Sequence, residues 1–454
     1  MGAPLVRSHL ALFTRIEAPA FEGSALVRVA ILSLFYPPEP AAGANRVAAM
    51  VRAFADAGHS VKVYTGMPSF PDGVIQPAYS GKRHAIERDG AIEIERVWTF
   101  ASSPSFPANR LLNWSSVSLG IAIRIVAVRE KYDAIVVSSP PITLAFPALL
   151  GAFAHLAPLV VDIRDVWPEM AIKVGSWNPN SPVAKIIGAI ADTLYERAAF
   201  IACVTESACA EIVARRVDPA KIVLAPNGFD PLEPAASSPL ATPPGVRDVV
   251  YAGNMGFASG LNVVLDAAGL LRDDPTIRFV LIGGGADAMK LRARVANEGL
   301  ANVVFTGPLP RAEALRAVAD AAATVVSLVP ELVDTIPAKM FDAMVAGSPM
   351  VVSAGGEAQR LIERADAGIA VPPGDPQALA AGIRRILGDD SMRARFRANG
   401  PSFVRANYDR AATMRDFAAR VASCCRARSE TGKPAVERPQ SERASDNAPL
   451  GRLA

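Results

Sequence analysis

The sequence predicts an α/β protein with two doubly wound domains. Its 454 residues are more than one domain normally holds, and 51% of them are hydrophobic, which is enough to fill two cores. Short apolar stretches alternate with helical stretches in two separate series, the pattern of parallel sheets covered on both faces. Between the two series lie residues 231–245, which are rich in Pro, Ala and Ser and predict a linker.

The first series predicts a domain over residues 27–230. A helical stretch is expected at 43–57, and strands are expected where apolar and β-branched residues run together, at 27–34, 60–65, 134–138 and 159–163. The segment 140–161 carries no charge, but it contains four prolines, Pro147 and Pro158 among them, and leads directly into Asp162. We therefore expect a buried helix followed by a buried strand here, rather than a membrane span.

The second series predicts a domain over residues 246–400. Its expected strands are 248–252, 279–282, 303–305, 323–328 and 350–352. A further helical region follows at 401–426, where apolar side chains recur at helical spacing between Tyr408 and Val421.

Composition excludes several classes of protein. The formal charge of +3 is small for this length, so no nucleic-acid partner is indicated. Four cysteines show neither metal-ligand spacing nor a disulfide framework, which indicates a reducing, cytoplasmic compartment. With four scattered histidines and no Asp-x-Asp triplet, we expect no bound metal and no other cofactor. Residues 1–26 form an extension whose apolar run is interrupted by charges, and the polar residues 427–454 predict a disordered tail.

The most informative stretch is residues 334–349. Asp334 and Asp342 stand eight positions apart across an expected loop-to-helix junction, and a Gly-Ser-Pro turn and an apolar strand follow. A helix N-terminus suits a phosphate, and carboxylates suit hydroxyl groups. Phosphate together with hydroxyls describes a nucleotide sugar. The alternative interpretation is a helix entry that acidic residues merely stabilise through the helix dipole.

Two loops of the first domain are candidate binding elements, because ligands of open α/β sheets bind at the carboxyl ends of strands. In the loop 36–46, Gly43 would let backbone N–H groups approach a pyrophosphate; a Pro-rich turn before a helix is the alternative. In the loop 164–169, Asp165 stands next to a tryptophan and a proline, which makes it a candidate catalytic residue or part of a capped turn.

Two Gly-rich loops of the second domain end strands in the same way. The first contains Asn254 and Gly256, and the second begins at Gly283. Glycine turns of this kind also serve dinucleotides, but Ala301 and Asn302 stand where an acidic residue would hold a dinucleotide's ribose. With two domains, the active site is expected in the cleft between them.

Residues 27 to about 420 resemble the retaining glycosyltransferases of family 4, which have the GT-B fold of two Rossmann-like domains facing across a cleft. The resemblance is greatest to the branch of colanic acid and O-antigen transferases that includes N-acetylfucosaminyl transferases. It rests on an ordered set of motifs: Phe35-Tyr-Pro-Pro-Glu39, Gly58-His-Ser-Val61, Arg164-Asp-Val-Trp-Pro-Glu169, Pro226-Asn-Gly-Phe-Asp230, Tyr251-Ala-Gly-Asn-Met-Gly256 and Pro337-Ala-Lys-Met-Phe-Asp342.

The resemblance implies roles for individual residues. Asp334 and Asp342 replace the two glutamates of the family's E-x₇-E motif, so Asp334 would contact the donor sugar and Asp342 the ribose hydroxyls. The family's cationic pyrophosphate ligands are missing from their usual places, which Asn254 and the Ser259-Gly260 pair occupy. Lys339 or Arg311 would supply that charge. The final helix would cross back to pack on the first domain.

The implied activity is a retaining hexosyl transfer from a UDP- or GDP-linked sugar, with Asp165 and Asp334 at the reacting centre. The acceptor would be a lipid-linked saccharide in surface polysaccharide or O-antigen assembly. The apolar, aromatic segment 98–128, with arginines at intervals, fits docking on the inner face of the membrane; an ordinary buried helix is the alternative. Two other functions stay open: a nucleotide-sugar epimerase or hydrolase of this shape, and a noncatalytic binding partner with a decayed site.

Overall fold

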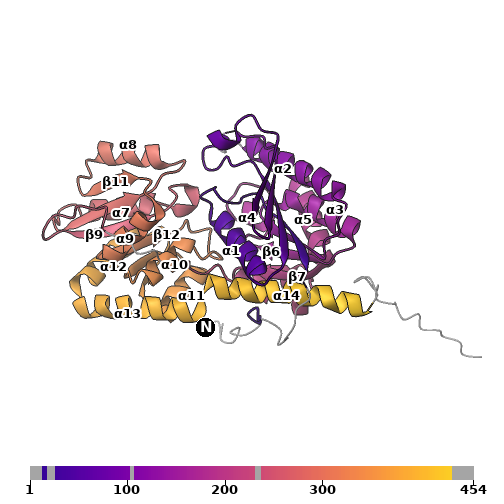
Figure 1. Ribbon diagram of the computed structural model, residues 1–454. Coiled ribbons are helices and arrows are strands. Elements are labelled where there is room, and N and C mark those ends of the chain that lie inside the picture. Colours follow the sequence, from indigo (N-terminus) through magenta and orange to yellow (C-terminus); the bar gives the residue numbers. More distant parts are fainter. Residues whose placement is uncertain (1–12, 18–25, 103–106, 231–236, 432–454) are drawn as a thin grey trace, which may run out of the picture.

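The computed structural model describes residues 13–17, 26–102, 107–230 and 237–431. The chain forms two sheets side by side, each with helices on both faces (Figure 1). The first sheet has the strand order β3-β4-β2-β1-β5-β6-β7-β8, and the second has the order β11-β10-β9-β12-β13-β14. All of these neighbours run parallel except β3 and β4. This confirms the predicted fold of two doubly wound domains.

The first sheet consists of β1 (Arg28–Leu32), β2 (Ser60–Gly66), β3 (His84–Asp89), β4 (Ile92–Val97), β5 (Ala134–Ser139), β6 (Leu159–Ile163), β7 (Ala198–Cys203) and β8 (Ile222–Leu224). The helices of this part of the chain are α1 (Ala42–Asp56), η1 (Pro77–Tyr79), α2 (Pro107–Ala127), η2 (Ile142–Leu144), α3 (Ala145–His155), α4 (Glu169–Lys173), α5 (Pro182–Arg197), α6 (Glu206–Ala214) and η3 (Pro219–Lys221).

The second sheet consists of β9 (Arg247–Ala252), β10 (Ile277–Ile282), β11 (Val303–Gly307), β12 (Ala323–Ser327), β13 (Met350–Ser353) and β14 (Gly368–Val371). Its helices are η4 (Phe257–Ser259), α7 (Asn262–Leu270), α8 (Ala288–Glu298), α9 (Arg311–Asp320), α10 (Ala338–Val345), α11 (Gly356–Ala365), α12 (Pro376–Gly388) and α13 (Asp390–Asn407), and α14 (Arg410–Thr431) follows.

Strand β1 shows why the first sheet is covered on both faces. Its side chains alternate between the two sides of the sheet. Val29 and Ile31 belong to the core cluster under α1 and α14, whereas Ala30 and Leu32 belong to the cluster under α2, α3 and α5. Both sets are fully buried. A strand buried on both faces reads as a continuous apolar run, which is why the sequence revealed it.

Helix α14 returns to the first domain, as the resemblance implied. In Figure 1 it extends from the second domain along the base of the first. Phe417 is fully buried and packs its ring against Phe54 at 6.3 Å and Phe200 at 5.7 Å between ring centroids. The helix continues to Thr431, beyond the expected end at residue 426. The rest of the expected tail, 432–454, lies outside the described residues.

The expected strands are all present, and the structure adds the β3–β4 hairpin and the strands β7, β8 and β14, which were not predicted. The hairpin had a usable signal, since Asp89-Gly90 lies between two alternating stretches and Gly90 has a φ of +58°. Segment 140–161 forms η2, α3 and the start of β6, so the expected helix and buried strand are present. The helix is not buried all round as expected, because Phe146 and Phe153 are exposed on its outer side. Within the described residues, no helix has the length and apolar character needed to cross a bilayer.

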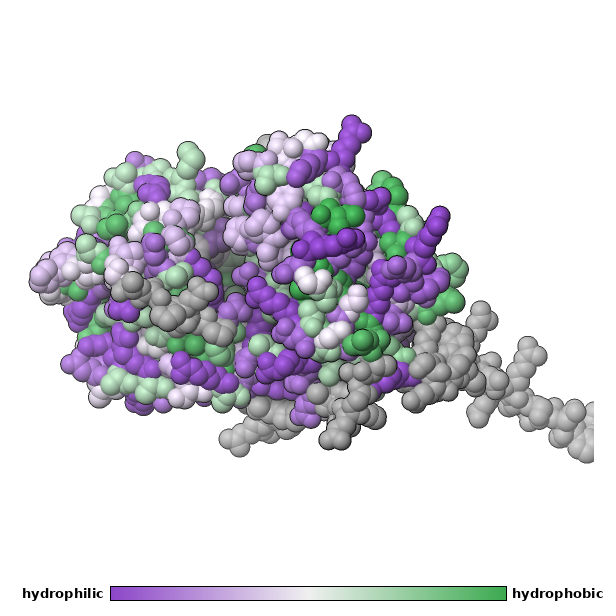
Figure 2. All heavy atoms as spheres, in the orientation of Figure 1, coloured by the Kyte–Doolittle hydropathy of each residue, from purple (hydrophilic) through white to green (hydrophobic). Residues whose placement is uncertain are grey.

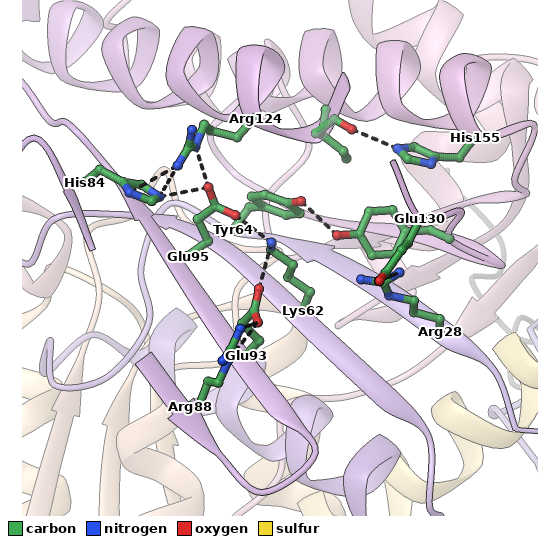
Figure 3. Close-up of polar contacts among 12 residues, drawn as sticks. Arg28, Lys62, Tyr64, His84, Arg88, Glu93, Glu95, Arg124, Glu130 and His155 are labelled. Atoms are coloured by element: carbon green, nitrogen blue, oxygen red, sulfur yellow. Dashed lines mark hydrogen bonds and ion pairs between the residues drawn. The ribbon is translucent and has the colours of Figure 1, made fainter. Parts of the chain in front are cut away.

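A polar network fastens α2 to the first sheet (Figure 3). Glu95 on β4 accepts hydrogen bonds from Arg124 of α2 at 2.5 Å and from Lys62 of β2 at 2.7 Å, and it also pairs with His84. The Tyr64 and Tyr132 hydroxyl groups hydrogen-bond beside it at 2.8 Å. These contacts fix which face of α2 points inward.

Candidate active site in the interdomain cleft

A cavity of about 230 Å³ lies between the two domains. Figure 2 shows the surface hollowed between the two lobes. The first domain contributes loops that follow β1, β6 and β7, and the second contributes the segment that leads into α10. The lining includes Gly43, Arg164, Asp165, Lys173, Thr205, Glu211, Asn227, Asp334, Thr335, Ile336 and Pro337. Parallel strands thus end where the two domains meet, as the topology rule requires.

Asp165 lies at the carboxyl end of β6, two residues beyond its last strand position. The residue lines the cavity. Burial raises the pKa of Asp165, although the neighbouring Arg164 guanidinium acts in the opposite direction. A carboxyl group with a raised pKa in a cleft is a candidate for proton transfer or for polarising a reacting sugar.

Gly43 lies directly against the Arg164 side chain. A Cβ at position 43 would collide with the Arg164 guanidinium, so any larger residue there would force the Arg164 side chain to move. Arg164 donates a hydrogen bond from Nη2 to the Pro140 carbonyl at 2.7 Å, and burial lowers its pKa. The contact with Arg164 therefore explains in terms of packing why a glycine stands at position 43. Its approach to a pyrophosphate stays a prediction.

Lys173 joins the two domains inside the cavity. Its Nζ lies 2.5 Å from Asp334 Oδ2 of the second domain and also contacts Glu211 Oε1 of the first. Burial by itself would lower the pKa of Lys173, but hydrogen bonds to Asp334 and Glu211 outweigh it and raise that pKa. The carboxylate expected to meet the donor sugar is thus held by a lysine from the opposite domain.

Asp342 lies on α10, away from that cavity. Its Oδ1 is 3.3 Å from Arg311 Nη2, and the same Nη2 is 3.6 Å from Asp230. Arg410, at the start of α14, pairs with Asp230 at 2.7 Å. Burial raises the pKa of Asp342, and the two arginines offset this only in part. Asp342 therefore lies close to Asp230, where the first domain ends, and to the start of α14, where the chain returns to it.

Lys339 extends from α10 beneath the end of β9. Its Nζ donates a hydrogen bond to the Tyr251 hydroxyl group at 2.6 Å and lies 4.1 Å from the centre of that ring. Burial lowers the pKa of Lys339 to about 7. Gly253 lies so close that a Cβ there would stand 3.3 Å from this Nζ. A partly buried cation at a strand end can receive a phosphate group.

The two Gly-rich loops of the second domain pack on each other. Gly283 has a φ of +127°, and a Cβ there would collide with the Gly253 carbonyl. The Asn254 carbonyl accepts hydrogen bonds from the Tyr251 hydroxyl group at 2.6 Å and from the Ser259 hydroxyl group at 2.8 Å. Together the loops form one surface above β9 and β10.

The cleft thus brings together Gly43, Asp165 and Asp334, while the other candidate residues form a neighbouring set in the second domain. Asn254, Gly256, Gly283, Lys339 and Asp342 do not line the same cavity. Arg164, Lys173 and Glu211 also line the cleft and were not predicted as cleft residues. Arg164 stood in a motif that was singled out, but no local pattern marked Lys173 or Glu211. Among the described residues, no cluster of three or more His, Cys, Asp or Glu is arranged to hold a metal ion.

The fold consists of two Rossmann-like domains with a cavity between them. Comparisons with protein families identify the class of enzyme. Residues 42–228 match the glycosyl transferase 4-like domain, and residues 246–389 match the glycosyl transferases of group 1. The chain therefore belongs to the group 1, family 4-like glycosyltransferases and is a glycosyltransferase of GT-B fold.

Two curated relatives align over most of the chain. The glycosyl transferase WcaI of Escherichia coli (strain K12), whose name refers to colanic acid biosynthesis, is 25% identical over 378 residues, covering 80% of this chain and 92% of WcaI. The glycosyltransferase WbjE of Pseudomonas aeruginosa is 25% identical over 332 residues, covering 70% of this chain and 82% of WbjE.

Solved structures share the fold. HepE of Anabaena, determined with UDP and glucose, has a TM-score of 0.63 and 17% identity, covering 87% of this chain and all of HepE. WaaG, described as a glycosyltransferase of lipopolysaccharide biosynthesis, has a TM-score of 0.61 and 14% identity, covering 87% of this chain and 99% of WaaG.

Proposed function

We propose that this glycosyltransferase moves a sugar, with retention of anomeric configuration, from a nucleotide diphosphate sugar to a lipid-linked saccharide at the inner face of the membrane. The product would enter surface polysaccharide or O-antigen assembly. One observation carries the proposal: Asp165 of the first domain and Asp334 of the second line the same cleft cavity. A donor sugar held by one domain would there meet an acceptor held by the other.

The donor is assigned to the second domain. The Gly253 and Gly283 loops present backbone at the ends of β9 and β10, and Lys339 places a cation beneath them. Asp342 lies one helical turn beyond Lys339 and can accept hydrogen bonds from ribose hydroxyls. HepE was determined with UDP and glucose, which supports a UDP-sugar as the donor for this chain; a GDP-sugar is the alternative.

The transfer requires that the bond from the anomeric carbon to the diphosphate oxygen breaks. The acceptor hydroxyl oxygen forms the new bond on the same face, and its proton passes to the departing diphosphate. Lys339 and Arg164 supply positive charge that can stabilise the leaving diphosphate. Asp334 would hold the donor sugar, once Lys173 has released it, and Asp165 would orient the acceptor hydroxyl or polarise the reacting sugar.

The acceptor is the part of the proposal that rests most on relatives. WcaI carries a name from colanic acid biosynthesis, and WaaG is described with lipopolysaccharide biosynthesis. A lipopolysaccharide is a saccharide attached to a lipid, so we propose a lipid-linked saccharide as the acceptor, with a polyprenyl-diphosphate saccharide as the form to test. Such an acceptor would require the enzyme to work at a membrane surface.

Mass spectrometry of reaction products tests the proposal. The purified protein is incubated with a panel of UDP- and GDP-sugars and a short-chain polyprenyl-diphosphate sugar. We expect one donor to give an acceptor larger by one sugar, with the donor's anomeric configuration by NMR. Asp165→Asn and Asp334→Asn should lower this activity strongly in folded protein. Release of free sugar, or an epimer formed without acceptor, would indicate the hydrolase or epimerase instead; no donor binding by calorimetry would indicate a noncatalytic partner.

A further inference from the structure

Three neighbouring helices of the first domain expose an unusual number of large apolar side chains. Helices α2, α3 and α5 pack on the same face of the first sheet. Figure 2 shows several separate hydrophobic patches among hydrophilic residues on the visible side of this lobe. The exposed apolar residues of α2 are Leu111, Leu112, Leu119, Ile123 and Val126. Those of α3 are Phe146 and Phe153, with Leu156 directly after the helix, and those of α5 are Val183, Ile186 and Ile190. We call this set the apolar face. Patches of this kind mark sites of interaction.

Helix α3 has no polar outer side. Its only polar side chain is His155, which is buried and lies 2.8 Å from the Ile125 carbonyl of α2 (Figure 3). Phe146 and Phe153 point outward and are 57% and 79% exposed, and Leu156 just beyond the helix is 67% exposed. A surface helix in a monomer normally carries polar residues on its outer side. The outer side of α3 therefore fits an apolar surrounding better than water.

Helix α2 continues the apolar face. Leu112, Leu119, Ile123 and Val126 recur at intervals of seven, four and three residues, so they form one exposed stripe. The opposite side of the helix is buried in the core. Arg124 could interrupt the stripe with a charge, but its guanidinium turns inward to Glu95 at 2.5 Å (Figure 3). The helix is thus apolar toward the core and toward the outside.

Charges around the apolar face favour a negatively charged partner. The sequence from residue 98 to 129 contains no Asp or Glu. Arg110 and Arg129 are exposed near the two ends of α2, and Lys185 is exposed among the apolar residues of α5. Of the nearby carboxylates, Glu130 pairs with Arg28 and Asp192 with Arg215; Glu196 lies at the far end of α5.

We propose that the apolar face docks on an anionic lipid bilayer. The phenylalanine and leucine side chains would enter the boundary of the acyl chains, while Arg110, Arg129 and Lys185 meet lipid phosphates. A second copy of the chain fits less well, because pairing the face with itself would bring like charges together. The inference deepens the proposed function, since a lipid-linked acceptor requires a surface of this kind on the enzyme.

Vesicle flotation tests the docking surface without donor or acceptor. Wild-type protein should float with vesicles that contain about a third phosphatidylglycerol, and less with pure phosphatidylcholine vesicles. The double variant Phe146→Ser/Phe153→Ser should bind at least about tenfold more weakly, because two large apolar side chains no longer enter the lipid. The matched control Val74→Ser/Met289→Ser changes residues that are 70% and 83% exposed outside the apolar face, and it should bind like the wild type.

A second double variant, Val183→Ser/Ile186→Ser, keeps the test meaningful if the α3 variant fails to fold. Equal flotation of wild type and both variants would overturn the proposal, as would wild-type protein that does not float. The proposal would also be overturned if the wild type formed a dimer in analytical ultracentrifugation and both variants were monomers. A second copy of the chain would then cover the apolar face. Failure of the transfer reaction leaves the flotation result intact. If both proposals hold, the α3 variant should lose activity on vesicle-bound acceptor and keep it on a water-soluble one.

Discussion

Lys173 of α4 and Asp334, just before α10, form an ion pair that joins the two domains across the cleft, with Nζ and Oδ2 2.5 Å apart. The two side chains are each about 30% exposed, so water reaches the pair. A pair of this kind contributes about 0.2–1 kcal/mol, which a bound ligand can replace. A donor sugar that takes over Asp334 would release Lys173.

Lys173→Met should therefore favour donor binding at little cost in stability. We expect kcat/KM to rise by up to about fivefold, equivalent to about 1 kcal/mol, because the donor sugar no longer has to displace Lys173 from Asp334. The melting temperature should change by only about 2–4 °C, as for a change of about 1 kcal/mol in a large domain. Steady-state kinetics and thermal melts check this. Arg316→Met removes a similar ion pair within α9 and should leave kcat/KM unchanged.

Asp342→Asn should weaken donor binding. If Asp342 accepts hydrogen bonds from the ribose, the affinity for the nucleotide should fall by about 1.5–3 kcal/mol, the range for a hydrogen bond to a charged group. Calorimetry with UDP and GDP measures the loss, and circular dichroism verifies the fold. Asp320→Asn, on the neighbouring helix α9, serves as control. Unchanged affinity in folded Asp342→Asn would contradict the ribose assignment.

Lys339 should make donor binding depend on pH. In the empty protein its pKa is lowered by burial to about 7, so a diphosphate must bind a lysine that is partly neutral at pH 7 and mostly neutral above it. UDP affinity should fall as pH rises from 7 to 9, whereas uridine affinity should not. Lys339→Met keeps most of the apolar stem and should abolish this difference. Calorimetry across that range decides between a phosphate role and a purely structural one.

The same lysine should influence stability. Its folded pKa of about 7 lies below the usual 10.5, so the unfolded chain binds more protons than the folded protein between these values. The free energy of unfolding should therefore rise as pH increases from about 7 to 10.5. It should be lowest below pH 7, where the lysine is protonated in both the folded and the unfolded state. Urea unfolding at several pH values should show a rise for the wild type that Lys339→Met reduces. Identical pH profiles would count against burial of this amine.

Transfer should continue in excess chelator. The sequence contains no Asp-x-Asp triplet, and the charge of the leaving diphosphate is assigned to Lys339 and Arg164. We expect the rate in millimolar EDTA to stay within about twofold of the rate with magnesium, a difference of less than 1 kcal/mol. A rate that EDTA abolishes and magnesium or manganese restores would show that a divalent ion is required.

Phe417→Ala should loosen the return of α14 to the first domain. The ring is fully buried between Phe54 and Phe200, and its loss leaves a cavity in the core. A loss of about 3–5 kcal/mol in the free energy of unfolding is expected. Met289→Ala, at an 83% exposed position, is the matched control and should change stability by less than about 0.5 kcal/mol. Equal urea unfolding midpoints for the wild type and Phe417→Ala would show that α14 does not stabilise the first domain.

The sequence by itself determined the architecture of this protein. Strands such as β1 and β6 are buried on both faces, so they appear as continuous apolar runs in any context. The ordered motifs around Asp165, Asn254 and Asp334 then indicated the family, because each follows a strand end. These properties are local: they depend on neighbours in the chain, and reading the sequence recovers them.

Only the tertiary structure decided what those residues touch. Lys173 and Asp334 are 161 positions apart, so no spacing rule could pair them. Gly43 proved to make room for Arg164, a contact between the start of α1 and the loop after β6. The apolar face likewise required three helices to lie together. The sequence indicated docking only for segment 98–128, which contains α2, and not for α3 or α5. Contacts of this kind follow from how elements pack, and packing is a property of the whole fold.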